Sequence, residues 1–263
     1  MMDPVTKKNG KMKILAALLA CSLCVSLLLP GCNSAEAEPQ GAAQNSAVTQ
    51  EEPITEEPIT FETLETRQVS TERAALETWT MEDFEGKTIE ESQMLLELVM
   101  NPTLENAAAT ATQVVRGTVA KVEYTCLGYN PWTILSVSVE ETLEGEIEPG
   151  RMIDVYVFGG YAPLRTVYER QDWAHGTGEI TEEDLDTKVV YDTWEGSNTA
   201  EEGGEYVFYL VEPDEESDMP SDGYECGMGS FGQLEVNEDG TFTGKDYSTG
   251  EAVTYTQEEI PLP

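Results

Sequence analysis

The chain has little of what most catalytic and metal sites need, because it contains a single histidine, His175, among 263 residues. A Ser-His-Asp or Cys-His catalytic site, or a metal site with histidine ligands, would have to use that one residue. His175 lies in "RQDWAHGTGEITEED", far in sequence from either cysteine of the C-terminal half. The motifs H-E-x-x-H and G-x-S-x-G and a phosphate-binding glycine loop are absent as well. We therefore interpret His175 as a surface loop residue.

Basic residues are also scarce: 14 Lys and Arg stand against 51 Asp and Glu, a net charge of −37. Nucleic acids and anionic lipid head groups bind proteins through Lys and Arg that neutralise phosphates. The composition therefore argues against a nucleic acid as partner. It favours cations, basic partners and solubility, and a solvated acidic surface is its simplest explanation.

The apolar run at the N-terminus, "ILAALLACSLCVSLLL", has 16 residues and is shorter than the ~20 that span a bilayer as a helix. It follows four lysines between residues 7 and 13, which is typical of a signal peptide, here residues 1–31. The sequence Leu-Pro-Gly-Cys that ends at Cys32 resembles the bacterial lipobox, whose cysteine is acylated and begins the mature chain. We predict a lipoprotein anchored through Cys32 to the extracytoplasmic face of the cell membrane. The alternative is an ordinary secretory signal peptide.

Cysteine is rare in the rest of the chain: outside the signal peptide and the lipobox, only Cys126 and Cys226 remain. Outside the cytoplasm they can form a disulfide, which would stabilise the fold by up to ~4.7 kcal/mol for a loop of ~100 residues. Two free or buried thiols are the equal alternative, since two residues carry little pattern.

The segment 32–70 is rich in Ala, Glu, Gln, Thr and Pro and repeats a five-residue unit in "EEPITEEPIT". Proline interrupts helices, acidic residues repel each other, and too little apolar surface is present to offset chain entropy. We predict a disordered acidic tether. Residues 71–110 follow as a helical lead-in, in which apolar residues at helical spacing predict a helix over Thr88–Met100.

Strand-like alternation dominates residues 111–263 and predicts one mainly β domain. In "QVVRGTVAKVEYTC" the apolar positions change parity, as in a bulged, curved strand. A hairpin is predicted over "FGQLEVNEDGTFTG", with Gly240 at a left-handed turn position. A long insertion, residues 159–203, separates the third and fourth predicted strands.

The order of these strands resembles uncharacterised extracytoplasmic proteins of Gram-positive bacteria. The resemblance is carried by "ATQVVRGTVAKVEY", "VEETLEGEIEPG", "IDVYVFGG", "EEGGEYVFYLV" and "GMGSFGQLEV". Their pattern is similar to the netrin-like, OB-type barrel of tissue inhibitors of metalloproteinases. The resemblance implies a small OB/netrin-like β-barrel preceded by short α-helices. The inhibitor function is not implied, because those inhibitors chelate zinc through a free N-terminal cysteine, whereas Cys32 is predicted to be acylated.

Two groups of residues are candidates for binding. The insertion contains four aromatic residues, Tyr161, Tyr168, Trp173 and Trp194. They can form a platform for a sugar or peptide, or they can pack the insertion against the barrel. An acidic loop offers oxygen ligands that suit calcium, although its spacing is not that of an EF-hand: Asp214, Glu216, Asp218 and Asp222.

We expect a non-enzymatic cell-surface module that binds a protein, glycan or peptide through the insertion and the barrel loops. The alternative is a surface glycoside or cell-wall hydrolase that uses a pair of acidic residues. Fifty acidic residues in the mature chain offer such pairs at every spacing, so the sequence does not identify one.

Overall fold

The computed structural model describes residues 70–93, 100–170, 180–193, 196–214 and 217–263. These residues all belong to one compact unit, Glu56–Pro263. The predicted signal peptide, Cys32 and the tether up to residue 69 lie outside the described residues. No helix in the described ranges is both long and apolar enough to cross a membrane.

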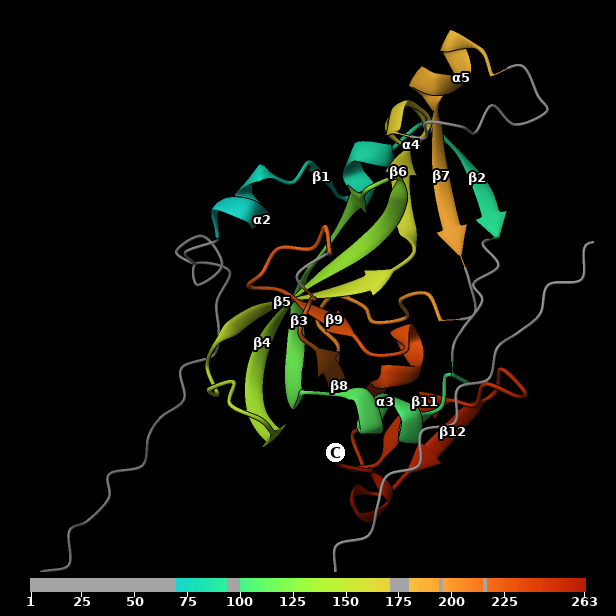
Figure 1. The fold of residues 1–263 in the computed structure, drawn as a ribbon. Helices are drawn as coiled ribbons and strands as arrows, with labels where there is room; N and C mark the ends of the chain where they lie inside the picture. Colours follow the sequence, from blue (N-terminus) through green and yellow to red (C-terminus); the bar gives the residue numbers. More distant parts are fainter. Residues whose placement is uncertain (1–69, 94–99, 171–179, 194–195, 215–216) are drawn as a thin grey trace, which may run out of the picture. The chain divides into compact units, whose positions relative to one another are not determined.

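The protein is mainly β, as the sequence predicts (Figure 1). Among the described residues its larger sheet has nine strands. Five of these strands build the core of the sheet: β3 (Gln113–Leu127), β4 (Asn130–Glu144), β5 (Met152–Phe158), β8 (Glu205–Val211) and β9 (Tyr224–Cys226). β3 pairs antiparallel with β4 on one side and with β8 on the other. β5 pairs with β4 and, in parallel, with β9, which in turn pairs with β8. The pairings therefore run from β3 through β4, β5, β9 and β8 and return to β3.

The alternating apolar residues of these strands meet in one buried cluster, as the alternation in the sequence predicts. The side chains of the cluster include Val115, Val119, Leu135, Val137, Val139, Ile153, Val155, Val157, Tyr206, Phe208 and Leu210. Burying alternate residues from all five strands is the main stabilising contribution of this arrangement.

The predicted irregularity of β3 is also present. The register between β3 and β4 shifts three times, the last shift lying between Val119 and Lys121. After that shift Val122 rather than Lys121 packs against the core. Gly117 lies at another shift, where a Cβ atom would be 2.3 Å from the carbonyl oxygen of Ser138. The strand can pass this close to its neighbour only because residue 117 has no side chain.

A second buried cluster lies where the C-terminal strands meet the helix that precedes β3. The elements are α3 (Leu104–Thr110), the 3₁₀ turn η2 (Gly229–Gly232), β10 (Gln233–Val236), β11 (Phe242–Lys245), β12 (Ala252–Tyr255) and the 3₁₀ turn η3 (Gln257–Glu259). Thr103 caps α3 by accepting a hydrogen bond from the backbone N–H of Asn106. The predicted hairpin is β10 with β11, and Gly240 has the left-handed conformation expected of it.

The lead-in is only partly helical, and the helix predicted over Thr88–Met100 is wrong for residues 88–93. The lead-in consists of α2 (Thr71–Ala75), β1 (Thr78–Trp79), the 3₁₀ turn η1 (Met81–Phe84), β2 (Thr88–Gln93) and α3. β2 pairs in parallel with a strand about a hundred residues later, and these main-chain hydrogen bonds outweigh a weak local preference for helix. Residues 94–99, which carry most of the helical pattern, lie outside the described residues.

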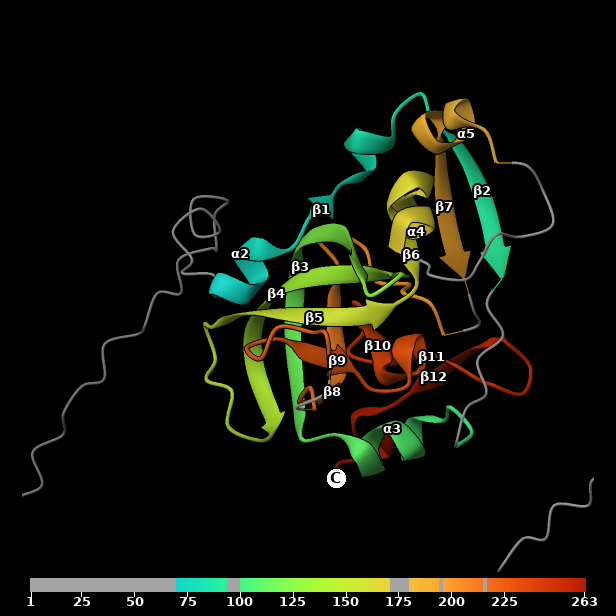
Figure 2. The ribbon, with the colours of Figure 1, turned by 45° about the horizontal axis from the view of Figure 1, so that its top comes forward.

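The insertion is a structured element rather than a long loop. It contains β6 (Gly160–Pro163), α4 (Leu164–Arg170), α5 (Glu182–Thr187) and β7 (Lys188–Thr193). β7 lies between β6 and β2 in a second, three-stranded sheet (Figure 2). The lead-in and the insertion therefore fold together, although the sequence suggested that they are separate pieces.

Candidate ligand-binding site

Three tyrosines come together where the second sheet meets β3. The rings of Tyr161 in β6 and Tyr191 in β7 are stacked, with centroids 4.2 Å apart and planes 10° from parallel. Tyr124 in β3 approaches Tyr161 edge-on at 5.0 Å. Buried Phe84 contacts both Tyr124 and Tyr161, at 6.2 and 6.1 Å. We call Tyr124, Tyr161 and Tyr191 the tyrosine cluster.

The chain brings Tyr161 to this position through two consecutive glycines after β5. Gly159 and Gly160 both have positive φ angles, which glycine adopts without a steric penalty. A Cβ atom on Gly160 would lie 2.7 Å from Oγ1 of Thr133 and 3.1 Å from the Tyr124 ring. Thr133 Oγ1 also donates a hydrogen bond to the carbonyl oxygen of Gly159 at 2.8 Å. This turn moves the chain from the larger sheet to the second one and sets Tyr161 beside Tyr124.

The tyrosine cluster lines a cavity of about 230 Å³, together with the segment 197–201. Internal hydrogen bonds hold this segment in place. Asn198 binds both the N–H and the carbonyl group of Ala200 and accepts a hydrogen bond from Gln233. The backbone N–H of Glu201 donates to the hydroxyl of Tyr206 at 3.1 Å. The lining of the cavity is therefore partly aromatic and partly polar. Phe84 packs against two of its tyrosines, and hydrogen bonds hold its polar segment.

Tyr124 and Tyr161 stay neutral over the whole physiological pH range. Burial, with nearby Tyr161 and Tyr191 contributing, raises the pKa of Tyr124 to about 12. Burial also raises the pKa of Tyr161, helped by Tyr191 and Glu91. Tyr124 and Tyr161 can therefore offer O–H donors and apolar ring surface but no charge. These are the groups that recognise a neutral ligand with hydroxyl groups and an apolar face.

The structure brings together only part of the predicted aromatic platform. Tyr161 belongs to the tyrosine cluster, whereas Tyr168 lies half-buried in α4 and does not line this cavity. Trp173 and Trp194 lie outside the described residues, as does His175. Tyr124 and Tyr191 are site residues that the sequence alone does not indicate. Both stand in alternating strand patterns, but only the pairing of β6 with β7 and the turn at Gly160 show that they are neighbours of Tyr161.

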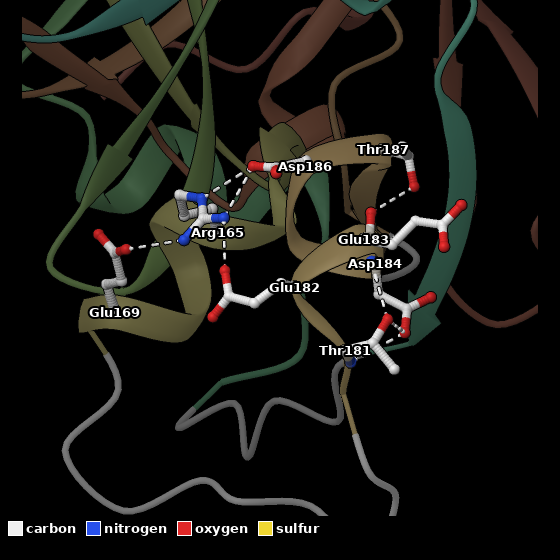
Figure 3. Close-up of polar contacts among 8 residues, drawn as sticks. All are labelled: Arg165, Glu169, Thr181, Glu182, Glu183, Asp184, Asp186 and Thr187. Carbon is white, nitrogen blue, oxygen red and sulfur yellow. Dashed lines mark hydrogen bonds and ion pairs between the residues drawn. The ribbon is translucent and has the colours of Figure 1, made fainter.

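An arginine joins the two helices of the insertion (Figure 3). Arg165 in α4 donates to Asp186 at 2.7 Å and to Glu182 at 3.0 Å, both in α5, and to Glu169 at 3.5 Å. These hydrogen bonds, those to Asp186 first, raise the pKa of Arg165. Thr181 caps α5 through a reciprocal pair of hydrogen bonds with Asp184. Arg165 thus joins α4 to α5.

Of the two alternatives for Cys126 and Cys226, the structure has two free, buried thiols. Cys126 packs against Ala162, whereas Cys226 belongs to the main core. Burial raises the pKa of both thiols to about 12. They are therefore apolar packing groups at neutral pH.

The predicted calcium ligands do not form a site in the described part of the loop. No group of three or more Asp, Glu, His or Cys side chains with the geometry of a metal site occurs among the described residues. Asp222 accepts a hydrogen bond from Ser70 at 2.7 Å, and Asp214 and Asp218 line a cavity beside Met219. Glu216 lies outside the described residues.

Comparison of the chain with models of known protein families and with curated proteins finds no match.

Proposed function

We propose that this protein is a lipoprotein held at the extracytoplasmic face of the membrane by Cys32, and that its folded part is a non-enzymatic binding module with an OB/netrin-like barrel. The barrel is supported by the strand pairings, which return to β3 after passing through four other strands. OB-type barrels bind oligosaccharides, oligonucleotides and proteins alike, so the fold alone does not select a ligand. The net charge of −37 disfavours an oligonucleotide.

The observation that carries the proposal is the tyrosine cluster beside a cavity with a polar wall. Stacked tyrosines present flat apolar surface, and their hydroxyls supply hydrogen bonds at the edges. A sugar ring matches this combination, because it has apolar C–H faces and a rim of hydroxyl groups. We therefore assign a glycan as the ligand, with one sugar ring in the cavity.

A binding role fits this site better than the alternative hydrolase. Hydrolysis of glycosides uses two carboxyl groups, about 5–10 Å apart, on opposite sides of the scissile bond. Among the described residues that line the cavity, Glu201 is the one carboxylate. The other groups on the lining are hydroxyls, amides and rings, which bind sugars without supplying an acid and a nucleophile.

The experiment is a titration of the full lipoprotein in detergent micelles with chitotriose, an oligomer of N-acetylglucosamine, followed by tyrosine and tryptophan fluorescence. We expect saturable binding that Tyr161→Ala weakens at least tenfold, because the central ring of the cluster is lost. Tyr161→Phe keeps the ring and is expected to weaken binding by less than Tyr161→Ala. Tyr129→Ala is the matched control, since Tyr129 is 40% exposed and does not line this cavity.

An equal loss of affinity for Tyr129→Ala and Tyr161→Ala would overturn the assignment of the site. Hydrolysis of chitotriose during the titration, detected as shorter oligomers by mass spectrometry, would support the hydrolase instead.

A further inference from the structure

The outer face of β3, β4 and β5, opposite the main core, carries two rows of side chains. Strand pairing sets Lys121 beside Ser136 and Ser136 beside Asp154, and sets Glu123 beside Ile134 and Ile134 beside Tyr156. Asp154 is 2% exposed, and Ile134 and Tyr156 are fully buried. A sheet face with a buried carboxylate, Asp154, and a partly buried one, Glu123, next to buried apolar groups must be covered by a segment that pairs with the charges and packs on the apolar groups.

Residues 70–76, which we call the strap, cover this face. The strap is α2 with its capping residues Ser70 and Leu76. Arg73 of the strap contacts two carboxylates of this face. Its Nε lies 3.1 Å from Oδ2 of Asp154 and its Nη2 lies 2.7 Å from Oε2 of Glu123. Leu76 packs on the apolar cluster that includes Ile134. One arginine and one leucine three positions later therefore make the buried contacts of the strap.

The carboxylates of Asp154 and Glu123 also contact side chains other than Arg73. Ser136 donates to Oδ1 of Asp154 at 3.0 Å, which leaves Oδ2 to face the guanidinium. Lys121 lies 3.0 Å from Oε1 of Glu123, and Thr78 donates to the same oxygen at 3.3 Å. These contacts orient the acceptors in a geometry that matches the forked donors of a guanidinium.

The other polar contacts of the strap are exposed. Ser70 donates to Asp222 at 2.7 Å. Ser221 donates to Glu72 through both its N–H and its hydroxyl, each at 2.8 Å. Leu76 also lines two cavities, of about 420 and 540 Å³. Open space therefore borders the strap, and its attachment depends chiefly on Arg73 and Leu76.

We propose that the outer face of β3, β4 and β5 is a second binding site, specific for a peptide segment with an arginine followed three positions later by a leucine, and that the strap occupies this site in cis. Charge complementarity selects the ligand, because two carboxylates at this face require a cation in a strongly acidic protein. The strap itself shows the bound pose. This site is independent of the tyrosine cluster, so either proposal can fail without the other.

The test uses the full lipoprotein in detergent micelles and a fluorescein-labelled peptide with the strap sequence, Ser-Thr-Glu-Arg-Ala-Ala-Leu. Arg73→Ala and Arg73→Lys weaken the strap in cis and make the site available. We expect both variants to bind the peptide at least tenfold more tightly than the unmodified protein does, measured by fluorescence anisotropy. A peptide with citrulline or lysine in place of arginine should bind at least tenfold more weakly than the arginine peptide.

Matched controls separate this site from a general change in the protein. Arg165→Lys weakens an ion cluster between α4 and α5 and should leave peptide binding at the level of the unmodified protein. Adding Asp154→Asn to Arg73→Lys should abolish the gain. Near-UV circular dichroism checks that each variant is folded, and Arg73→Lys provides the result if Arg73→Ala is not.

Three outcomes would overturn the proposal. They are equal peptide affinity for the unmodified protein and Arg73→Lys, an undiminished gain when Asp154→Asn is present, and equal binding of the arginine and lysine peptides.

Discussion

At the scale of single residues, the ionic contacts of this protein differ in how much they contribute. Arg165 contacts carboxylates that are mostly exposed, and exposed pairs typically contribute little to stability. The Arg73 side chain is only 10% exposed, and its partners Glu123 and Asp154 are 13% and 3% exposed. Removing the cation from such a buried set leaves two carboxylates without their partner in a poorly hydrated place.

We therefore predict that Arg73→Ala lowers the free energy of unfolding by about 3–5 kcal/mol. Arg165→Ala should lower it by much less, because water replaces the lost contacts. Urea denaturation of the full lipoprotein, followed by circular dichroism, measures both. Equal losses for the two variants would show that the buried position of Arg73 does not matter.

A second prediction concerns Asp192, which is 4% exposed and whose Oδ1 has no hydrogen-bond partner among the described residues. Burial raises the pKa of this carboxyl, and a hydrogen bond with Ser92 opposes the shift. The folded state therefore disfavours the ionised form. Asp192→Asn removes that charge and should stabilise the protein by about 1 kcal/mol at pH 7.

The gain from Asp192→Asn should shrink as the pH falls towards ~4, the ordinary pKa of an aspartate, because the folded carboxyl, whose pKa is raised, then becomes increasingly protonated. Urea midpoints of the two proteins at pH 4 and pH 7 check this. A loss of stability at pH 7 would contradict the account.

At the scale of elements, the parts predictable from sequence are those whose pattern is local. β4, β5 and β8 alternate cleanly and are where the sequence indicates, and the hairpin turn at Gly240 follows from its residues. β2 could not be predicted, because its strand state depends on β7, about a hundred residues away. The tyrosine cluster could not be predicted either. Tyr161 lies in an insertion that is recognisably aromatic, but only strand pairing determines that Tyr124 and Tyr191 are its neighbours.

Gly117 gives a prediction at this scale, since β3 pairs there with both β4 and β8. Gly117→Ala places a methyl group against the Ser138 carbonyl oxygen and within 2.9 Å of Val137. Forcing atoms into such a packed position typically costs about 1–3 kcal/mol, and here the opposing atom is backbone. Thr118→Ala, next in the chain, should change the stability by about 0.5 kcal/mol or less. Urea denaturation compares them, and equal losses would contradict the close approach.

At the scale of the whole molecule, several buried acids together predict how stability depends on alkaline pH. Burial raises the pKa of Cys126, Cys226 and Tyr124 to about 12 and raises that of Tyr209 as well. The unfolded chain releases these protons near the ordinary values of 9.0 for cysteine and 10.0 for tyrosine. The folded state thus holds more protons above pH 9, and stability must fall as the pH rises from 9 to 12.

The measurement is the urea midpoint of the full lipoprotein at intervals from pH 7 to pH 11, with thiol reactivity at pH 8 as an independent check. Cys126 and Cys226 should react with a thiol reagent only after unfolding. A constant midpoint, or rapid reaction of the native protein at these two thiols, would contradict the burial described here.

The central claim is that the tyrosine cluster binds a glycan, and the most direct test is saturation-transfer difference NMR on the full lipoprotein with chitotriose. Saturation of the aromatic protons should pass to the ring protons of the sugar, and Tyr161→Ala should abolish this transfer while Tyr129→Ala preserves it. No transfer in the unmodified protein, or equal transfer in Tyr161→Ala, would contradict the claim.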